Sequence, residues 1–182
     1  MRVTKTKDEM LAYVRLMQGL EPLRADCSVE YTDGIDVNAV LEQKIRARYL
    51  DLLRTAPRAL LAEDDLADEC SSLPVYSPGG TRVVLPAVCV RVFDICVSGW
   101  RKAVPVQGPE LKDIIVRRQK NPFTAATAES PVAVMNGDDP HSVLVFPGGE
   151  AVTTLSCVAD YGPARYAFDD AALNQFHNIF YG

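Results

Sequence analysis

Histidine is scarce in this chain of 182 residues, which contains only His141 and His177. Nucleophilic catalysis by Ser or Cys generally needs a base held close to the nucleophile, and that base is usually a His oriented by a carboxylate. No recognisable nucleophile motif surrounds either histidine or Cys157. We therefore expect that the protein is not an enzyme. The alternative is a small hydrolase that pairs Cys157, or another Cys, with His141 or His177.

Motifs for metals and cofactors are missing as well. The cysteines form no C-x-x-C pair and the histidines no H-x-x-x-H spacing, although such spacings are typical of metal sites. The glycine pairs at 79–80 and 148–149 lack the Lys-Ser/Thr of a phosphate loop and read as turns. No metal and no cofactor are expected. An odd number of scattered cysteines indicates reduced thiols in an intracellular protein; they are Cys27, Cys70, Cys89, Cys96 and Cys157.

Net positive charge and long apolar runs are also lacking. The formal net charge of -5 argues against sequence-specific binding of nucleic acid, which needs clustered Lys and Arg to neutralise phosphates. The apolar run from Leu85 to Val97 is interrupted by Arg91 and Asp94 and is shorter than the roughly 20 residues of a membrane helix. The polar first residues resemble no secretion signal. A cytoplasmic protein is expected.

The order of the predicted elements indicates the fold class. Helical patterns come first, strands follow with one helical insertion, and a helix closes the chain, which is the segregation typical of an α+β fold. The length suits one domain, so we predict a single domain over residues 1–182. Residues 1–68 would form a helical bundle, residues 69–80 a loop, and residues 81–182 an antiparallel β-rich part with a C-terminal helix.

The helices are predicted from apolar residues that recur at helical spacing. Asp33 or Asp36 can cap the second helix, and Pro57 ends it because proline lacks an N–H. The acidic run 63–65 is expected to be a solvated helix face or end. The predicted helices cover residues 8–20, 37–55, 58–66, 109–119 and 169–181.

The strands are predicted from runs rich in Val, Leu, Phe, Cys and Thr between turn residues. The turns at 137–140 and 147–150 should link the last three strands into an antiparallel meander. The predicted strands cover residues 82–85, 87–98, 131–136, 142–146 and 153–159.

Two groups of residues are candidates for contacts with other proteins. Trp100, Arg101 and Lys102 follow the longest strand, and Trp and Arg are common anchors of interfaces, although a Trp covered by its own domain fits equally well. Leu173, Phe176 and Phe180 form an apolar stripe near the end of the chain. We favour docking of this stripe to a partner over packing in the core, because chain ends are often mobile and residues 160–163 look like a hinge.

The segment 82–104 combines a strand with a tryptophan and two basic residues, namely Leu85, Pro86, Arg91, Ser98, Trp100, Arg101, Lys102 and Val104. It resembles the ring proteins of the neck in crAss-like and related short-tailed bacteriophages of Bacteroidales. Their strand reads Leu-Pro-Asp-Asp-Phe-Leu-Arg-Leu and is followed by Ser-x-Trp-basic-basic-Pro-Val. The segments 56–61 and 120–134 are also similar. Here 87–89 replace the Asp-Asp-Phe triplet and Ala103 replaces Pro, so the chemistry of the acidic pair is not carried over.

The resemblance implies a structural role in the virion. Proteins of this kind are head-to-tail connectors, or adaptors, that assemble into a ring below the portal, through which DNA passes. The expected partners are a portal or other neck proteins and further copies of the chain, first in the cytoplasm of the bacterial host and then in the virion neck. A monomeric regulatory module that binds a single partner protein remains the second alternative.

Overall fold

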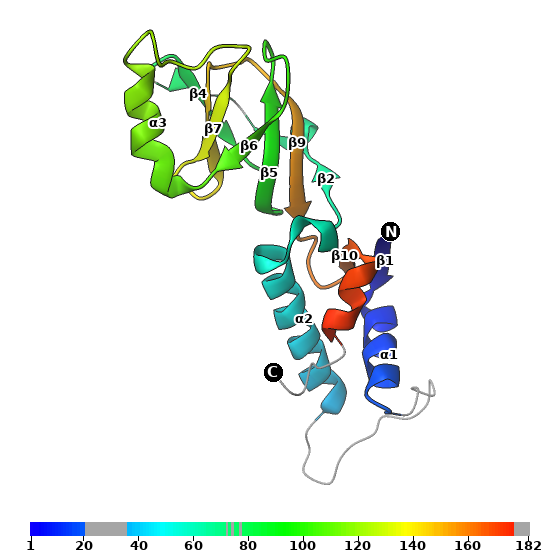
Figure 1. Ribbon diagram of the computed structural model, residues 1–182. Coiled ribbons are helices and arrows are strands. Elements are labelled where there is room, and N and C mark those ends of the chain that lie inside the picture. The colour runs from blue at the N-terminus through cyan, green and yellow to red at the C-terminus, as the bar shows by residue number, and fades with distance from the viewer. Residues whose placement is uncertain (21–35, 72, 74, 77, 177–182) are drawn as a thin grey trace. The chain divides into compact units, whose positions relative to one another are not determined.

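The computed structural model describes residues 1–20, 36–71, 73, 75–76 and 78–176 (Figure 1). Its mixture of helices and strands confirms the predicted α+β class. The chain forms two compact units, unit 1 from residues 1–62 and 160–182 and unit 2 from residues 63–159. These bounds differ from the predicted division at residues 69–80, because the last part of the chain returns to the N-terminal helices. A single domain stays a prediction.

In its described residues, unit 1 contains two α-helices and a small sheet, and the predicted helical bundle is not confirmed. A capping box between Thr6 and Glu9 begins the first helix, and Asp36, one of the two predicted caps, begins the second by accepting from the N–H groups of Asn38 and Ala39. The first strand pairs antiparallel with the last one. The elements are β1 (Arg2–Thr6), α1 (Lys7–Met17), α2 (Val37–Thr55), η1 (Arg58–Leu60), β10 (Arg165–Asp169) and η4 (Asp170–Phe176).

Tyr49 of α2 lies at the centre of the core of unit 1. Its ring makes edge contacts with Tyr166 and Phe168 of β10, at centroid distances of 5.0 and 6.2 Å. The Tyr49 hydroxyl donates to the Ala167 carbonyl at 3.2 Å and accepts from the Ala167 N–H at 3.1 Å. One hydroxyl therefore satisfies both main-chain groups of a buried strand residue, which would otherwise cost free energy.

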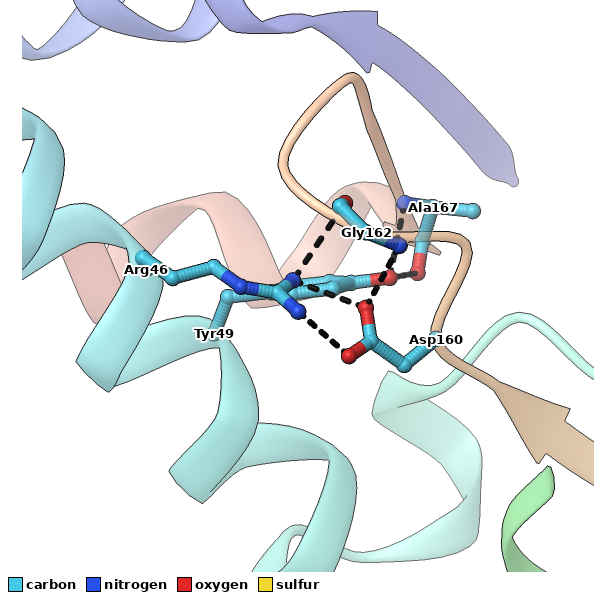
Figure 2. A network of polar contacts seen from close by, with 5 residues as sticks. All are labelled: Arg46, Tyr49, Asp160, Gly162 and Ala167. Atoms are coloured by element: carbon cyan, nitrogen blue, oxygen red, sulfur yellow. Dashed lines mark hydrogen bonds and ion pairs between the residues drawn. The ribbon is translucent and has the colours of Figure 1, made fainter. Parts of the chain in front are cut away.

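Arg46, one turn before Tyr49, holds the segment that returns from unit 2 (Figure 2). Its guanidinium donates to both carboxylate oxygens of Asp160 and to the Gly162 carbonyl, the last at 3.3 Å. Burial alone would raise the pKa of Asp160, but the hydrogen bonds from Arg46 and from the Gly162 N–H outweigh it and lower that pKa. Residues 160–162, predicted to belong to a hinge, are thus tied to α2.

Unit 2 contains one large sheet, in the strand order β2-β9-β5-β6-β7-β8-β4-β3. All neighbours are antiparallel except β6 and β7, which run parallel. The five predicted strands are present, and the described residues of unit 2 contain three further strands that were not predicted. The strands are β2 (Asp64–Asp65), β3 (Val75–Tyr76), β4 (Gly80–Val84), β5 (Cys89–Val97), β6 (Val104–Gln107), β7 (Val132–Met135), β8 (Ser142–Phe146) and β9 (Val152–Ala159).

The short connection after β2 requires this sheet to curl. Ser71 forms a β-bridge with Val84 of β4, and in a flat sheet of this strand order β2 and β4 would lie roughly 29 Å apart. The chain from Asp65 to Ser71 can span at most about 21 Å, and η2 (Ala67–Glu69), a compact 3-10 helix, takes up part of it. The two ends of the sheet must therefore approach each other.

Several expectations need correction. The predicted helix 58–66 ends as η1 at Leu60, and the acidic run 63–65 leads into the edge strand β2, because its main chain pairs with β9. β7 and β8 form a hairpin as predicted, but β9 leaves the meander to pair with β5 and β2. The last helix is the 3-10 helix η4, and residues 177–181 of the prediction lie outside the described residues.

The predicted helical insertion is confirmed as η3 (Pro109–Leu111) followed by α3 (Lys112–Gln119). Ile115 packs on Val134, Leu144 and Phe146, so that α3 covers part of the sheet. Within the residues that the structure describes, no helix has the length and apolar character needed to cross a membrane.

Replacing Arg46 by Met should destabilise unit 1 by about 1–3 kcal/mol, because the partly buried carboxylate of Asp160 loses its charged hydrogen-bond donor. Asp160 has a lowered pKa, so its contribution to stability is present above its unfolded pKa near 3.9 and is lost as the pH falls further. The difference between wild type and Arg46→Met should hence be constant from pH 5 to 7 and shrink below about pH 4.

Urea unfolding followed by circular dichroism measures this difference. Lys7→Met is the matched control, because the ion pair of Lys7 with Glu42 is much more exposed and exposed ion pairs contribute little to stability. Equal losses in the two variants would contradict a special role for Arg46.

Candidate interaction surface

Three turns of unit 2 meet around Trp100. The indole Nε1–H of Trp100 donates to the Pro147 carbonyl at 2.9 Å, and the N–H of Arg101 donates to the Ala128 carbonyl at 3.3 Å. These bonds join the turn after β5 to the turn before β9 and to the segment that follows α3. The predicted trio of Trp100, Arg101 and Lys102 therefore lies where the loops of the sheet are held together.

The members of this trio differ in exposure. Trp100 is buried, with 9% of its surface exposed, so it is covered by its own unit, as the second interpretation of this residue expected. Arg101 and Lys102 are exposed. Arg101 forms an ion pair with Glu129 at 3.1 Å, which is worth little at so exposed a position.

The C-terminal stripe is mostly part of unit 1. Phe176 is fully buried, and its ring lies 5.5 Å from that of Phe168. Leu173 is half-buried, and Phe180 lies outside the described residues. The docking hypothesis is therefore wrong for Phe176, because its side chain fills the core of its own unit.

The most exposed aromatic residue in the described chain is Phe123, which sequence reasoning missed. Phe123 follows α3 in the sequence and is 95% exposed, and Ile114 on α3 is 51% exposed. No other large apolar side chain among the described residues of unit 2 is exposed. We call Ile114, Arg117, Arg118, Lys120 and Phe123 the α3 surface. A signal was present in the sequence, since Pro122 and Phe123 follow directly on a run of cations.

Hydrogen bonds of the loop hold Phe123 in this exposed position. Asn121 accepts from the Phe123 N–H through its side chain at 3.0 Å, and Thr124 donates its hydroxyl to the Arg118 carbonyl at 2.9 Å. The Gln119 side chain accepts from the Ala126 N–H at 2.8 Å. The aromatic ring is thus presented by a bonded turn that continues α3.

The α3 surface carries positive charge in an acidic protein. Arg117, Arg118 and Lys120 are exposed, and no ion pair of theirs occurs within the described part of the chain. The two arginines in the last turn also stabilise the negative end of the helix dipole. Their charges remain available to an acidic partner.

A hollow of about 260 Å³ lies where η2 meets the turn before β9. The Ser98 hydroxyl fixes that turn by accepting from the N–H groups of Glu150 and Ala151 at 2.8 and 3.2 Å. The floor and walls mix apolar side chains with two carboxylates. The lining residues are Ala67, Asp68, Cys70, Ser71, Leu73, Glu150, Ala151 and Val152. We call it the seam hollow, because it lies beside the chain that closes the sheet.

Two cysteines of unit 2, Cys70 and Cys157, are poorly suited to nucleophilic chemistry, whereas the hydrogen bond from Cys157 lowers the pKa of Cys89. Burial raises the pKa of Cys70, in the seam hollow, to about 11, and nearby acidic groups add to the effect. The pKa of Cys157 is also raised, by its hydrogen bond with Cys89 and by burial, and its thiol donates to the Asp64 carbonyl at 3.6 Å. Thiols with raised pKa values stay protonated, whereas the thiolate is the nucleophile. These observations disfavour the hydrolase alternative that relies on Cys157.

Acidic, histidine and cysteine side chains do not converge on a metal site anywhere in the described ranges. The four cysteines of these ranges, Cys70, Cys89, Cys96 and Cys157, are free thiols. Cys27 lies outside the described residues.

We expect Cys70 to react slowly in the native protein. With a pKa near 11 instead of the usual value near 8.5, its thiolate fraction at pH 8 falls on the order of 100-fold. Iodoacetamide labelling at pH 8, followed by peptide mass spectrometry, should show Cys70 modified about 100 times more slowly in buffer than in urea. Equal rates in the two solvents would contradict the raised pKa.

Comparisons with known proteins do not place the chain. No protein-family model matches it, and no curated protein matches it either. The α3 surface, the seam hollow and the charge distribution are the features of the molecule that bear on its function.

Proposed function

We propose that this protein is a structural assembly protein, a ring-forming head-to-tail connector that docks to the portal of a tailed bacteriophage. The resemblance of residues 82–104 to connector proteins suggests the class. Its partners are then a portal or other neck proteins and further copies of the chain. It acts in the cytoplasm of the bacterial host during assembly and afterwards in the virion neck.

Phe123 is the observation that carries the binding role. Burying a large apolar side chain at an interface is worth roughly 1.5–3 kcal/mol, and residues that anchor interfaces are often aromatic or Arg. The loop hydrogen bonds order the main chain around Phe123 before a partner arrives, so little backbone entropy is lost on binding. Arg117 and Arg118 lie in the last turn of α3, shortly before this aromatic residue in the sequence.

The charge distribution suits a channel through which DNA moves. The net charge of -5 opposes tight electrostatic binding to phosphates. The cations of the α3 surface are too few to act as a nucleic-acid groove, and they lie beside an exposed aromatic and an exposed Ile. A protein partner fits this combination better than DNA does.

Reconstitution with the portal protein from the same genome tests the proposal. The isolated chain should be a monomer or small oligomer in dilute solution, since connectors of this kind often assemble only on a portal. Mixing the two proteins should yield a ring on the portal, visible by negative-stain electron microscopy. If the portal neither binds the chain nor changes its oligomeric state, the connector role is wrong, and the monomeric regulatory module becomes the better hypothesis.

The role proposed here needs no histidine chemistry. His141→Gln combined with His177→Gln should leave portal binding and the melting temperature close to those of the wild type. Loss of binding in a double variant that melts normally would instead show that the site depends on a histidine.

A further inference from the structure

We propose that Phe123 of one copy inserts into the seam hollow of a second copy, so that the chain associates head to tail through unit 2. This inference rests on the proposed assembly role and names the surfaces that carry it. It commits the α3 surface to a second copy of this chain rather than to an unrelated protein.

The shapes of the two surfaces are complementary. Phe123 projects from its loop with 95% of its side chain exposed, and a Phe side chain can bury on the order of 150–250 Å². The seam hollow has a volume of about 260 Å³, and Leu73 and Val152 line it with half-buried apolar groups. An aromatic ring is the kind of group that such a hollow accepts.

The charges around the two surfaces are complementary as well. Arg117, Arg118 and Lys120 accompany Phe123, whereas Asp68 and Glu150 line the hollow. The segment 63–69 next to the hollow contains five acidic residues and no basic one. These opposite charges favour a contact between the α3 surface of one copy and the seam hollow of another, and they disfavour a contact between two identical surfaces. Two α3 surfaces would repel each other, which disfavours a symmetric dimer through them.

The placement of the two surfaces determines the type of assembly. α3 and the acidic strand β2 lie on different sides of unit 2 (Figure 1), and the seam hollow begins two residues after β2. A contact between different surfaces of identical chains is heterologous, and it produces a closed ring or an open filament according to the rotation between copies. Both surfaces belong to the same compact unit, so that rotation is the same at every contact.

Photo-crosslinking identifies the contact directly. The probe is p-benzoylphenylalanine introduced at position 123 of the full chain, at about 0.3 mM protein in low salt. Mass spectrometry should find intermolecular crosslinks to residues 67–73 and 150–152. The same probe at Leu16, which is also exposed but lies in unit 1, should give no crosslinks there. Crosslinks from position 123 to other residues only, or no intermolecular crosslinks, would overturn the proposal.

A pair of half-disabled variants tests the head-to-tail arrangement. Phe123→Ser keeps the hollow and lacks the ring, whereas Asp68→Lys with Glu150→Lys keeps the ring and reverses the charge of the hollow. Each should self-associate at least tenfold more weakly than the wild type in sedimentation velocity, while its melting temperature stays unchanged. Their mixture should form one-to-one dimers and nothing larger, and raising NaCl to about 0.5 M should weaken these dimers.

Leu16→Ser is the matched control and should associate like the wild type. Unaltered association of Phe123→Ser, or failure of the two half-disabled variants to combine, would show that the interface is wrong. Portal binding by the wild type is measured separately. If the chain forms the expected crosslinks but does not bind the portal, the connector role is wrong and the head-to-tail contact is supported. If it binds the portal without these crosslinks, the head-to-tail contact is wrong and the connector role is supported.

Discussion

The short connection between β2 and β3 is the constraint on which unit 2 depends. Asp65 belongs to one edge of the strand order, while Ser71, a few residues later, pairs with β4 near the other edge. The sheet can satisfy both pairings only by curling. The connecting segment then lies beside the turn before β9, and together they form the seam hollow. The seam hollow, with its apolar and acidic lining, thus results from the closing of the sheet.

Different parts of unit 2 carry the two surfaces that the proposed assembly uses. The insertion between β6 and β7 places α3 over the sheet through Ile115, and the loop after α3 continues outward to Phe123. The acidic segment lies at the seam.

Unit 1 depends on contacts between residues that are far apart in the sequence. Its small sheet pairs the first strand with the last. Two residues of α2 contact the C-terminal segment: Arg46 binds Asp160 before β10, and Tyr49 binds Ala167 within β10. This arrangement explains why Phe176 is buried. η4 packs against β10, so Phe176 completes a core that the N-terminal helices alone would leave open.

The sequence by itself determined the local elements: the α+β class, α1, α2 with its Asp36 cap, the helical insertion, and the five strands with strong apolar runs. Periodicity, capping and proline act within a few residues and can be read locally. Only the tertiary structure decided that β1 and β10 pair, that the acidic run is an edge strand, and that Trp100 and Phe176 are buried while Phe123 is exposed. Strand pairing and burial depend on partners distant in the chain, and no local pattern specifies which surface the folded molecule will cover.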